Sequence, residues 1–165
     1  MPLHDVDGMI DRVIEREVGR PIAEIKAGKA TGWVDHPADP GGETQFGISK
    51  RSYPQLDIKS LTYRDAHRIY REDFYDRFAL SQVRSSQIAE WLLDWLVHSG
   101  PSVIQRVQRK LGVEADGIVG PETLKALNAL ADPRDILRWR LEFLVSLTKH
   151  PFIKGWIKRL VELGL

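Results

Sequence analysis

The sequence predicts a mainly α-helical protein with a small irregular or β region. Two observations carry this prediction: apolar residues recur at helical spacing along most of the chain, and only residues 31–54 form a long segment rich in proline and glycine. The chain has 165 residues, 42% of them hydrophobic, which is enough for one core with a small appended element. It has no cysteine, so the fold depends on packing rather than on disulfides.

Helices are expected on both sides of this Pro/Gly-rich segment. Residues 5–18 place their apolar side chains on one helix face, and Pro21 can begin a short second helix over residues 22–30. The helical pattern returns at Leu61 and continues to Phe74. Any strands in the segment between the helices are expected to be short.

The second half of the chain is expected to be helical apart from one turn-rich loop at residues 112–123. Residues 85–98 are the most hydrophobic segment, with apolar side chains around most of the helix, which predicts a position at the centre of the core. Trp91, Trp95 and Trp139 lie on apolar stripes and are expected to be buried. Further helices are predicted over residues 103–111, 121–130, 133–148 and 151–163.

The formal net charge is only +1, but the charges are unevenly distributed. Residues 1–60 hold eight Lys or Arg against ten Asp or Glu, whereas residues 134–165 hold seven against three. The basic end favours an anionic surface such as a cell wall, although a solvated helix face explains it equally well. Because no basic stripe with interleaved aromatic residues is present, we expect no nucleic-acid partner.

Several other classes of protein are disfavoured by the sequence. No apolar run is long enough to span a bilayer, so we expect no stable membrane insertion. Residues 1–7 lack the basic and then apolar pattern of a secretion signal, which predicts that the protein remains in the cytoplasm after synthesis. The histidines are scattered, with no two spaced to share a helix face, so no metal site is predicted.

The Pro/Gly-rich segment and the helix before it form an arrangement typical of sugar-cleaving sites. Glu17 lies at the end of that helix, where the macrodipole disfavours a negative charge and so favours a protonated general acid. Asp39 lies in a polar loop and is expected to stay ionised, while Thr44 can hold a water through its hydroxyl group. Hydrolysis of a glycosidic bond requires an acid on one side and a base or nucleophile on the other.

Each of these residues also has an ordinary structural interpretation. Most helix glutamates are solvated, which would make Glu17 a surface residue. Asp39 can stabilise an Asx turn, and Thr44 can cap a turn or a helix. In the same segment, Trp33 is the best candidate for stacking on a sugar ring.

Residues 37–49 resemble the signature of glycoside hydrolase family 108, the phage-type N-acetylmuramidases. The resemblance rests on Pro-Ala-Asp-Pro-Gly-Gly-Glu-Thr at 37–44 followed by Phe-Gly-Ile-Ser at 46–49. Similar residues continue at Ser52-Tyr-Pro54, Leu61-Thr62, Asp65-Ala66 and Ile69-Tyr-Arg71. The resemblance implies a lysozyme-like helical catalytic region over residues 1–100. Residues 101–165 are similar to the family's helical C-terminal peptidoglycan-binding element, expected to pack on the same globule.

The resemblance also implies roles for individual residues. The family's general acid corresponds to Glu17, and its aspartate and threonine correspond to Asp39 and Thr44. Trp33 replaces a family tyrosine, and His98 stands where the family often has an asparagine in the cleft floor. The expected substrate-binding residues are Trp33, Gln45, Phe46, Tyr53 and His98.

The spacing of the two carboxylates departs from the family pattern. Glu17 and Asp39 are 22 residues apart, much farther than in the family. We interpret Arg20–Gly32 as an insertion of 13 residues, which can lengthen a loop, form a lid or displace the acid. The insertion also offers a rival acid, Glu24, although Glu17 alone combines the helix end with the family position.

We therefore predict a peptidoglycan hydrolase: a lysozyme, or N-acetylmuramidase, that needs no cofactor. It would cleave the β-1,4 bond between N-acetylmuramic acid and N-acetylglucosamine. As a monomeric phage endolysin it would wait in the host cytoplasm and reach the wall through a separate membrane lesion, such as one made by a holin. Two alternatives remain open: a lytic transglycosylase acting on the same bond, and a non-catalytic wall-binding module.

Overall fold

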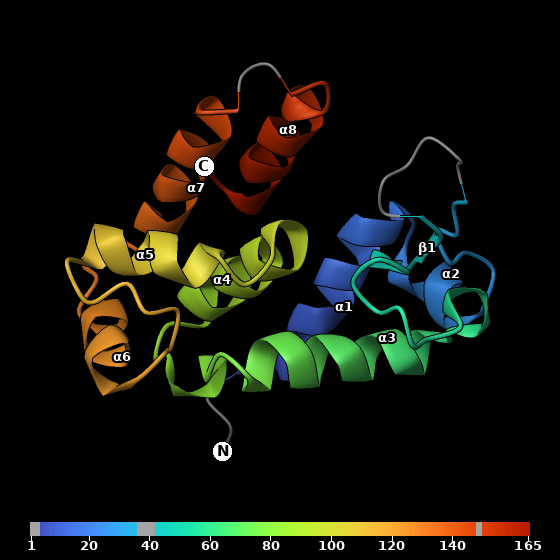
Figure 1. The fold of residues 1–165 in the computed structure, drawn as a ribbon, viewed down its shortest axis with the longest axis horizontal. Helices are drawn as coiled ribbons and strands as arrows, with labels where there is room; N and C mark the ends of the chain where they lie inside the picture. Colours follow the sequence, from blue (N-terminus) through green and yellow to red (C-terminus); the bar gives the residue numbers. More distant parts are fainter. Residues whose placement is uncertain (1–3, 36–41, 148–149) are drawn as a thin grey trace. The chain divides into compact units, whose positions relative to one another are not determined.

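The computed structural model describes residues 4–35, 42–147 and 150–165 (Figure 1). The prediction of a mainly α protein with a small β element is confirmed, since a single short hairpin is the only sheet among the described residues. The chain forms two compact units. We call residues 5–73 the N-terminal unit, and His4 together with residues 74–165 the C-terminal unit.

The N-terminal unit is built around the first helix. Its elements are α1 (Val6–Val18), α2 (Ile22–Lys26), β1 (Thr44–Gln45), β2 (Ile48–Ser49), the 3-10 turn η1 (Ile58–Ser60) and α3 (Tyr63–Tyr70). The apolar face predicted for α1 is buried, and α1 packs against α2 and α3. A π-helical segment, η2 (Arg71–Asp76), follows α3 directly, and the boundary between the two units falls within it.

Local capping explains where two of these helices begin and end. The Asp5 side chain accepts a hydrogen bond of 3.1 Å from the Gly8 N–H at the start of α1. Gly19 ends α1 in the left-handed conformation. Thr62 and Asp65 form a reciprocal capping box at the start of α3, as the sequence signal at Thr62 predicted.

The C-terminal unit is centred on α4. It comprises the 3-10 turn η3 (Leu80–Gln82), α4 (Ser86–Ser99), α5 (Val103–Leu111), α6 (Pro121–Asn128), α7 (Asp135–Val145) and α8 (Ile153–Leu163). Helix α4 packs against η3, α5 and α7, and α7 packs against α8 (Figure 1). Trp91 and Trp95 are buried as predicted, whereas Trp139 is half-buried because one side of it lines a hollow.

The turn-rich loop between α5 and α6 is fixed by one buried glutamine. The Gln108 side-chain amide donates to Asp116, to the Ile118 carbonyl and to Thr123, at 2.8–3.0 Å. Its carbonyl oxygen accepts from the Gly117 N–H at 2.8 Å. The acidic, glycine and threonine positions of this loop therefore have a structural explanation.

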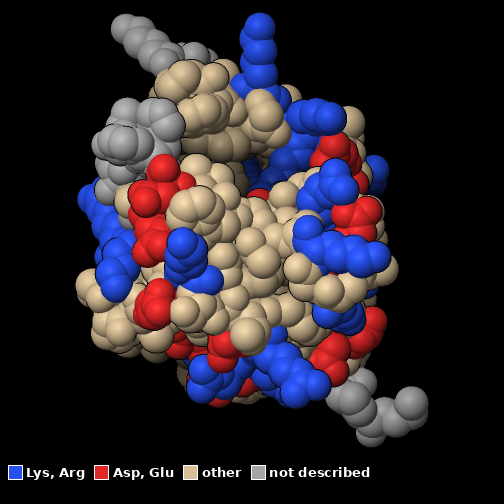
Figure 2. All heavy atoms as spheres, turned by 90° about the vertical axis from the view of Figure 1, so that its right-hand side faces the viewer, with Lys and Arg blue, Asp and Glu red and all other residues tan. Residues whose placement is uncertain are grey.

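Basic and acidic side chains are interspersed on the face of the molecule drawn in Figure 2, around a largely uncharged central area. This face carries no broad field of one sign, which agrees with the small formal net charge. None of the helices in the described part of the chain is both long enough and apolar enough to cross a bilayer. Within the same residues, no group of three His, Asp or Glu side chains gathers to hold a metal ion.

Candidate active site

Glu17 lies in the last turn of α1, where its side chain is half-buried. Four apolar residues of α1 are buried, and they fix the orientation of the helix within the N-terminal unit. Gly19, which caps the C-terminal end of α1, then turns the chain away in the left-handed conformation. The helix therefore presents the Glu17 carboxyl group from a rigid support rather than from a loop.

A two-residue hairpin faces this carboxyl group. Strands β1 and β2 pair Gln45 with Ile48, which leaves Phe46 and Gly47 as the turn. Both turn residues have positive φ, 52° and 79°, the combination that defines a type I′ hairpin. A left-handed conformation costs a phenylalanine on the order of 1 kcal/mol, so other contacts must hold Phe46 in place.

Two hydrogen bonds hold the turn in this conformation. The Phe46 N–H donates to the Thr31 carbonyl at 2.8 Å. The Tyr70 hydroxyl, from the end of α3, donates to the Phe46 carbonyl at 2.6 Å, and this bond is buried. Tyr70 therefore connects α3 to the same turn that α1 faces.

The Glu17 side chain lies directly against Gly47. A Cβ atom placed on Gly47 would be 2.9 Å from both Cγ and Oε2 of Glu17 and 2.6 Å from the Tyr70 hydroxyl oxygen. Real Cβ atoms essentially never make contacts this short, so a larger residue here would displace the side chains of Glu17 and Tyr70. Position 47 thus favours glycine twice, once for its φ and once for the space that the carboxyl group of Glu17 occupies.

Thr44 begins the hairpin and also closes the loop before it. Val34 and Thr44 form an antiparallel bridge with two backbone hydrogen bonds of 2.8 and 2.9 Å. The Thr44 side chain is half-buried, and its hydroxyl group donates to the Gly42 carbonyl at 3.3 Å. Asp39 belongs to the loop that this bridge closes, but it lies outside the described residues.

The two ends of the proposed insertion, Arg20–Gly32, lie close together at the end of α1. A Cβ atom on Gly32 would lie 3.3 Å from the Cα atom of Val18, so the end of the segment packs against the last residue of α1, two residues before the segment starts. Within it, the Ile22 N–H at the start of α2 donates to the Glu15 carboxylate at 3.0 Å. This geometry supports the interpretation of an insertion that leaves α1 intact.

Two further contacts anchor α2. Lys26 pairs with Asp11 of α1, and Asp11 also accepts a hydrogen bond from the Tyr63 hydroxyl of α3. Burial, together with this hydrogen bond to Asp11, raises the pKa of Tyr63 to about 12. The rival acid Glu24 forms an i, i+4 ion pair with Arg20 at 2.7 Å on an exposed surface. The residue against the hairpin turn is therefore Glu17, and Glu24 has a separate role on the surface of α2.

Comparisons with known proteins identify the family. Residues 25–100 match the family model of glycosyl hydrolase 108, and residues 100–161 match that of a predicted peptidoglycan domain. The chain therefore carries a glycosyl hydrolase 108 domain followed by a predicted peptidoglycan domain. Among solved structures it is similar to SagA of Brucella abortus, with 28% sequence identity, a TM-score of 0.69 and coverage of 86% of this chain and 88% of SagA. No curated protein was found to match the chain.

The glycosyl hydrolase 108 domain, together with the peptidoglycan domain, supports a glycoside hydrolase that acts on peptidoglycan. The family match begins at Ile25, so it includes Thr44 and the Asp39 loop but not Glu17. The division into a catalytic region over residues 1–100 and a C-terminal element over residues 101–165 stays a prediction.

Trp33 is the most exposed of the predicted substrate-binding residues. Its side chain is 42% exposed, and the Lys59 ammonium lies 5.4 Å from its ring centroid. The indole N–H donates to the Glu43 carboxylate at 3.4 Å. A ring held from one side in this way can stack on a sugar with its other face.

Gln45 and Phe46 are buried, with 3% and 1% of their surface exposed. The Gln45 side-chain amide donates to the carbonyl oxygens of Leu61, at 2.6 Å, and Lys59, at 3.3 Å. These bonds tie β1 to the segment around η1. The structure thus gives both residues a part in shaping the hairpin that faces Glu17.

Tyr53 and His98 lie in different surroundings. Tyr53 is half-buried in the N-terminal unit, and its hydroxyl group donates to the Asp73 carboxylate at 2.8 Å. His98 lies near the end of α4 in the C-terminal unit, with its ring edge-on to Trp156 at 5.3 Å. Burial, and after it the charges of Arg140 and Arg159, lowers the pKa of His98 to about 4. His98 is therefore neutral at the pH of a cell.

The sequence did not indicate that Tyr70 and Gly47 belong to the site. The helical spacing of Tyr70 predicted only that it faces the core, because its partner Phe46 is 24 residues away. For Gly47 a signal was present: a glycine following one residue between two short extended segments is a hairpin pattern. Phe46 obscured that signal, since phenylalanine is not a residue expected at positive φ.

Proposed function

We propose that this protein is a lysozyme that cleaves the β-1,4 bond between N-acetylmuramic acid and N-acetylglucosamine. In this proposal Glu17 is the general acid and protonates the oxygen of the leaving sugar as the bond from that oxygen to the anomeric carbon breaks. Asp39 and Thr44 position the water, or stabilise the positive charge that develops at the anomeric carbon. Water supplies the hydroxyl group and the proton that complete the two products.

One observation carries the assignment of the acid. The Glu17 carboxyl group lies against Gly47 at the hairpin turn, and this hairpin begins with Thr44. The hairpin therefore brings the candidate acid to the element that carries the candidate threonine, and the Val34–Thr44 bridge attaches the Asp39 loop to the same strand. The Glu17 side chain is half-buried, so part of its surface stays open to a substrate.

The test compares two isosteric substitutions seven residues apart, Glu17→Gln and Glu24→Gln. Purified peptidoglycan sacculi are incubated with each variant, and the released muropeptides are quantified by chromatography. General acids contribute roughly 10²–10⁴-fold to a rate, so Glu17→Gln should lose at least a hundredfold. Glu24→Gln should stay within twofold of the unmodified protein. Inactivity of Glu24→Gln with an active Glu17→Gln would move the acid into the insertion and overturn the assignment.

The products distinguish hydrolysis from the lytic transglycosylase reaction. Hydrolysis adds water and leaves a reducing N-acetylmuramic acid, whereas intramolecular attack leaves a lighter anhydro sugar that lacks one water. We expect products of the hydrolysed mass, because a transglycosylase can work with a lone glutamate and has no need of the Asp39 and Thr44 pair. Mass spectrometry of the same digests decides between the two reactions.

We further propose that the protein acts as a monomeric phage endolysin whose access to the wall depends on a membrane lesion. Expression in a Gram-negative host should leave the cells intact until the inner membrane is permeabilised with chloroform, and should then cause rapid lysis. Lysis without permeabilisation would contradict the need for a separate lesion. Permeabilised cells that bind the protein but do not lyse would favour the wall-binding module instead.

A further inference from the structure

The C-terminal unit contains a hollow of about 410 Å³ between α5 and α7, with Trp95 of α4 in its wall. A volume of this size is in the range of small-molecule sites. Two kinds of side chain line most of it. Three are aromatic and three are basic: Trp95, Trp139, Phe143, Arg106, Arg109 and Lys110.

The aromatic side chains form a continuous apolar wall. Trp95 is 1% exposed, and its ring centroid is 6.3 Å from that of Phe143. Trp139 and Phe143 are half-buried on α7, so each keeps part of its surface open to the hollow. Such a wall suits an aliphatic chain or the face of a sugar.

The basic side chains come from one face of α5, because positions 106, 109 and 110 follow helical spacing. Lys110 is paired with Glu142, the one acidic residue in the lining. The Arg106 guanidinium lies over the Phe143 ring at 4.2 Å. Arg109 is exposed and has no acidic partner among the described residues. The hollow therefore carries a net positive charge next to its apolar wall.

We propose that this hollow binds a carboxylate of the peptidoglycan stem peptide, with Arg109 holding the carboxylate and Trp139 and Phe143 packing on the adjoining aliphatic carbons. This proposal rests on the proposed function, because that function makes peptidoglycan the ligand. The location of the free carboxylates favours the peptide over the glycan as the ligand. In an intact wall the lactyl group of each muramic acid is amide-linked to the peptide, so the free carboxylates are those of the peptide. An exposed arginine beside an aromatic wall, in a hollow of net positive charge, matches that combination of charge and aliphatic chain.

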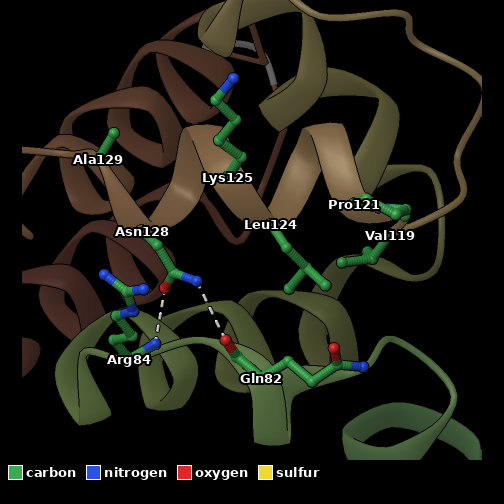
Figure 3. Close-up of a pocket in the computed structure, with 9 residues that line it drawn as sticks. Gln82, Arg84, Val119, Pro121, Leu124, Lys125, Asn128 and Ala129 are labelled. Carbon is green, nitrogen blue, oxygen red and sulfur yellow. Dashed lines mark hydrogen bonds between the residues drawn. The ribbon is translucent and has the colours of Figure 1, made fainter.

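A second hollow in the same unit serves as an internal control. It has a volume of about 660 Å³ and lies between residues 82–84 and α6 (Figure 3). Arg84 and Lys125 make it basic as well, but no aromatic residue lines it. The Asn128 side chain in its wall already bonds the Arg84 N–H at 2.7 Å and the Gln82 carbonyl at 3.1 Å. This hollow has the charge of the proposed site without its apolar wall.

The test measures binding to sacculi in the Glu17→Gln background, so that cleavage does not remove the ligand. Arg109→Glu and Lys125→Glu each reverse one exposed charge and change the net charge equally. Binding is measured by depletion from solution at increasing amounts of purified sacculi, and thermal melting confirms that both variants are folded. We expect Arg109→Glu to weaken binding at least tenfold and Lys125→Glu to change it less than twofold.

A second arm identifies the ligand. Soluble stem tripeptide is compared with the same tripeptide whose carboxyl groups are amidated. The tripeptide should compete with intact sacculi for the parent protein, whereas the amidated tripeptide should not. Equal weakening by both charge reversals would reduce the effect to general electrostatics and overturn the proposal. Equal competition by the amidated tripeptide would mean that the hollow does not bind a carboxylate and would overturn it too.

Failure of this proposal is distinguishable from failure of the proposed lysozyme activity. Release of muropeptides by the unmodified protein tests the activity, and depletion by the inactive Glu17→Gln protein tests the hollow. A protein that binds through Arg109 but releases no product would retain this site and lose the lysozyme assignment.

Discussion

Helices α1 and α4 each carry a carboxylate away from bulk water, but their surroundings differ in kind. Glu17 is half-buried against a glycine in a hairpin turn. Asp94 is completely buried and accepts hydrogen bonds from Arg140 at 2.6 Å and from Arg159 at 2.8 and 3.0 Å. Burial alone would raise the pKa of Asp94, but the two arginines outweigh it and hold that pKa well below its usual value.

The difference between these surroundings indicates a different role for each carboxylate. Asp94 is kept ionised by two cations from α7 and α8, so it fixes those helices to α4 and has no proton to give near neutral pH. Glu17 lies against Gly47, with part of its surface open. The buried Asp94 pairs are therefore structural, whereas Glu17 stays the candidate for proton transfer.

The largest expected effect is on the stability of the C-terminal unit. Asp94→Asn leaves Arg140 and Arg159 without their buried countercharge, and breaking a buried pair in this way costs about 3–5 kcal/mol. Urea unfolding followed by circular dichroism measures the loss. The exposed Glu114→Gln should change stability by less than about 0.5 kcal/mol. An Asp94→Asn protein as stable as the parent would show that the network contributes nothing to folding.

The second prediction concerns pH. Because the pKa of His98 falls from 6.5 to about 4 on folding, the unfolded chain binds a proton between these values that the folded chain does not. Stability therefore falls as the pH is lowered from about 6.5 to about 4, by up to about 3 kcal/mol. The groups around His98 are Asp94, Arg140 and Arg159, and Asp94 adds a loss only below pH 3.8.

Thermal melting between pH 4 and pH 7 checks this prediction. His98→Gln should remove most of the pH dependence in that window and leave the loss below pH 3.8 in place. An unchanged profile in His98→Gln would mean that another group titrates on unfolding.

The third prediction disturbs the surroundings of Glu17 without changing Glu17 itself. Gly47→Ala places a methyl group where the Glu17 side chain and the Tyr70 hydroxyl lie, at a φ that disfavours alanine. We expect roughly a hundredfold loss of muropeptide release, which corresponds to about 2.7 kcal/mol in the activation barrier. The loss of stability should be smaller, about 1–2 kcal/mol. Gly28→Ala is the control, because Gly28 also has positive φ but no atom within 4 Å of its added Cβ.

The smallest expected effect comes from the hydroxyl group of Thr44. Thr44→Val keeps the shape and removes the hydroxyl group, so muropeptide release should fall about tenfold, or about 1.4 kcal/mol. Thr44→Ser keeps the hydroxyl group and should stay within threefold. Equal activity of the two variants would mean that the Thr44 hydroxyl group does not contribute to activity and that Thr44 only forms part of β1.

Local patterns predicted most of the fold, since helix spacing and caps depend on residues a few positions apart. The helices from α1 to α8 are found near their predicted ranges, although α2 ends at Lys26, before the predicted Ala30. Contacts between distant residues were not predictable in this way. The pairing of Asp94 with Arg140 and Arg159 spans 46 and 65 residues, and no local spacing indicates it.

For the candidate site, residue type and spacing pointed to Glu17, Asp39 and Thr44, and their roles stay predictions. The placement of Glu17 against Gly47 depends instead on the left-handed conformation of Phe46, which two long-range hydrogen bonds impose. A sequence pattern shows which residues are present, but such a conformation is set by tertiary contacts.

The contact between Gly32 and Val18, at the two ends of the Arg20–Gly32 segment, has a practical consequence for engineering. A segment whose two ends meet can change in length at little entropic cost, because the cost of closing a loop grows only logarithmically. Its exposed tip, residues 27–29, is remote in sequence from both α1 and the β1–β2 hairpin. A peptide that recognises a chosen bacterial surface can therefore be grafted at Gly28, giving a peptidoglycan hydrolase whose target is altered while α1 and the β1–β2 hairpin keep their native sequence.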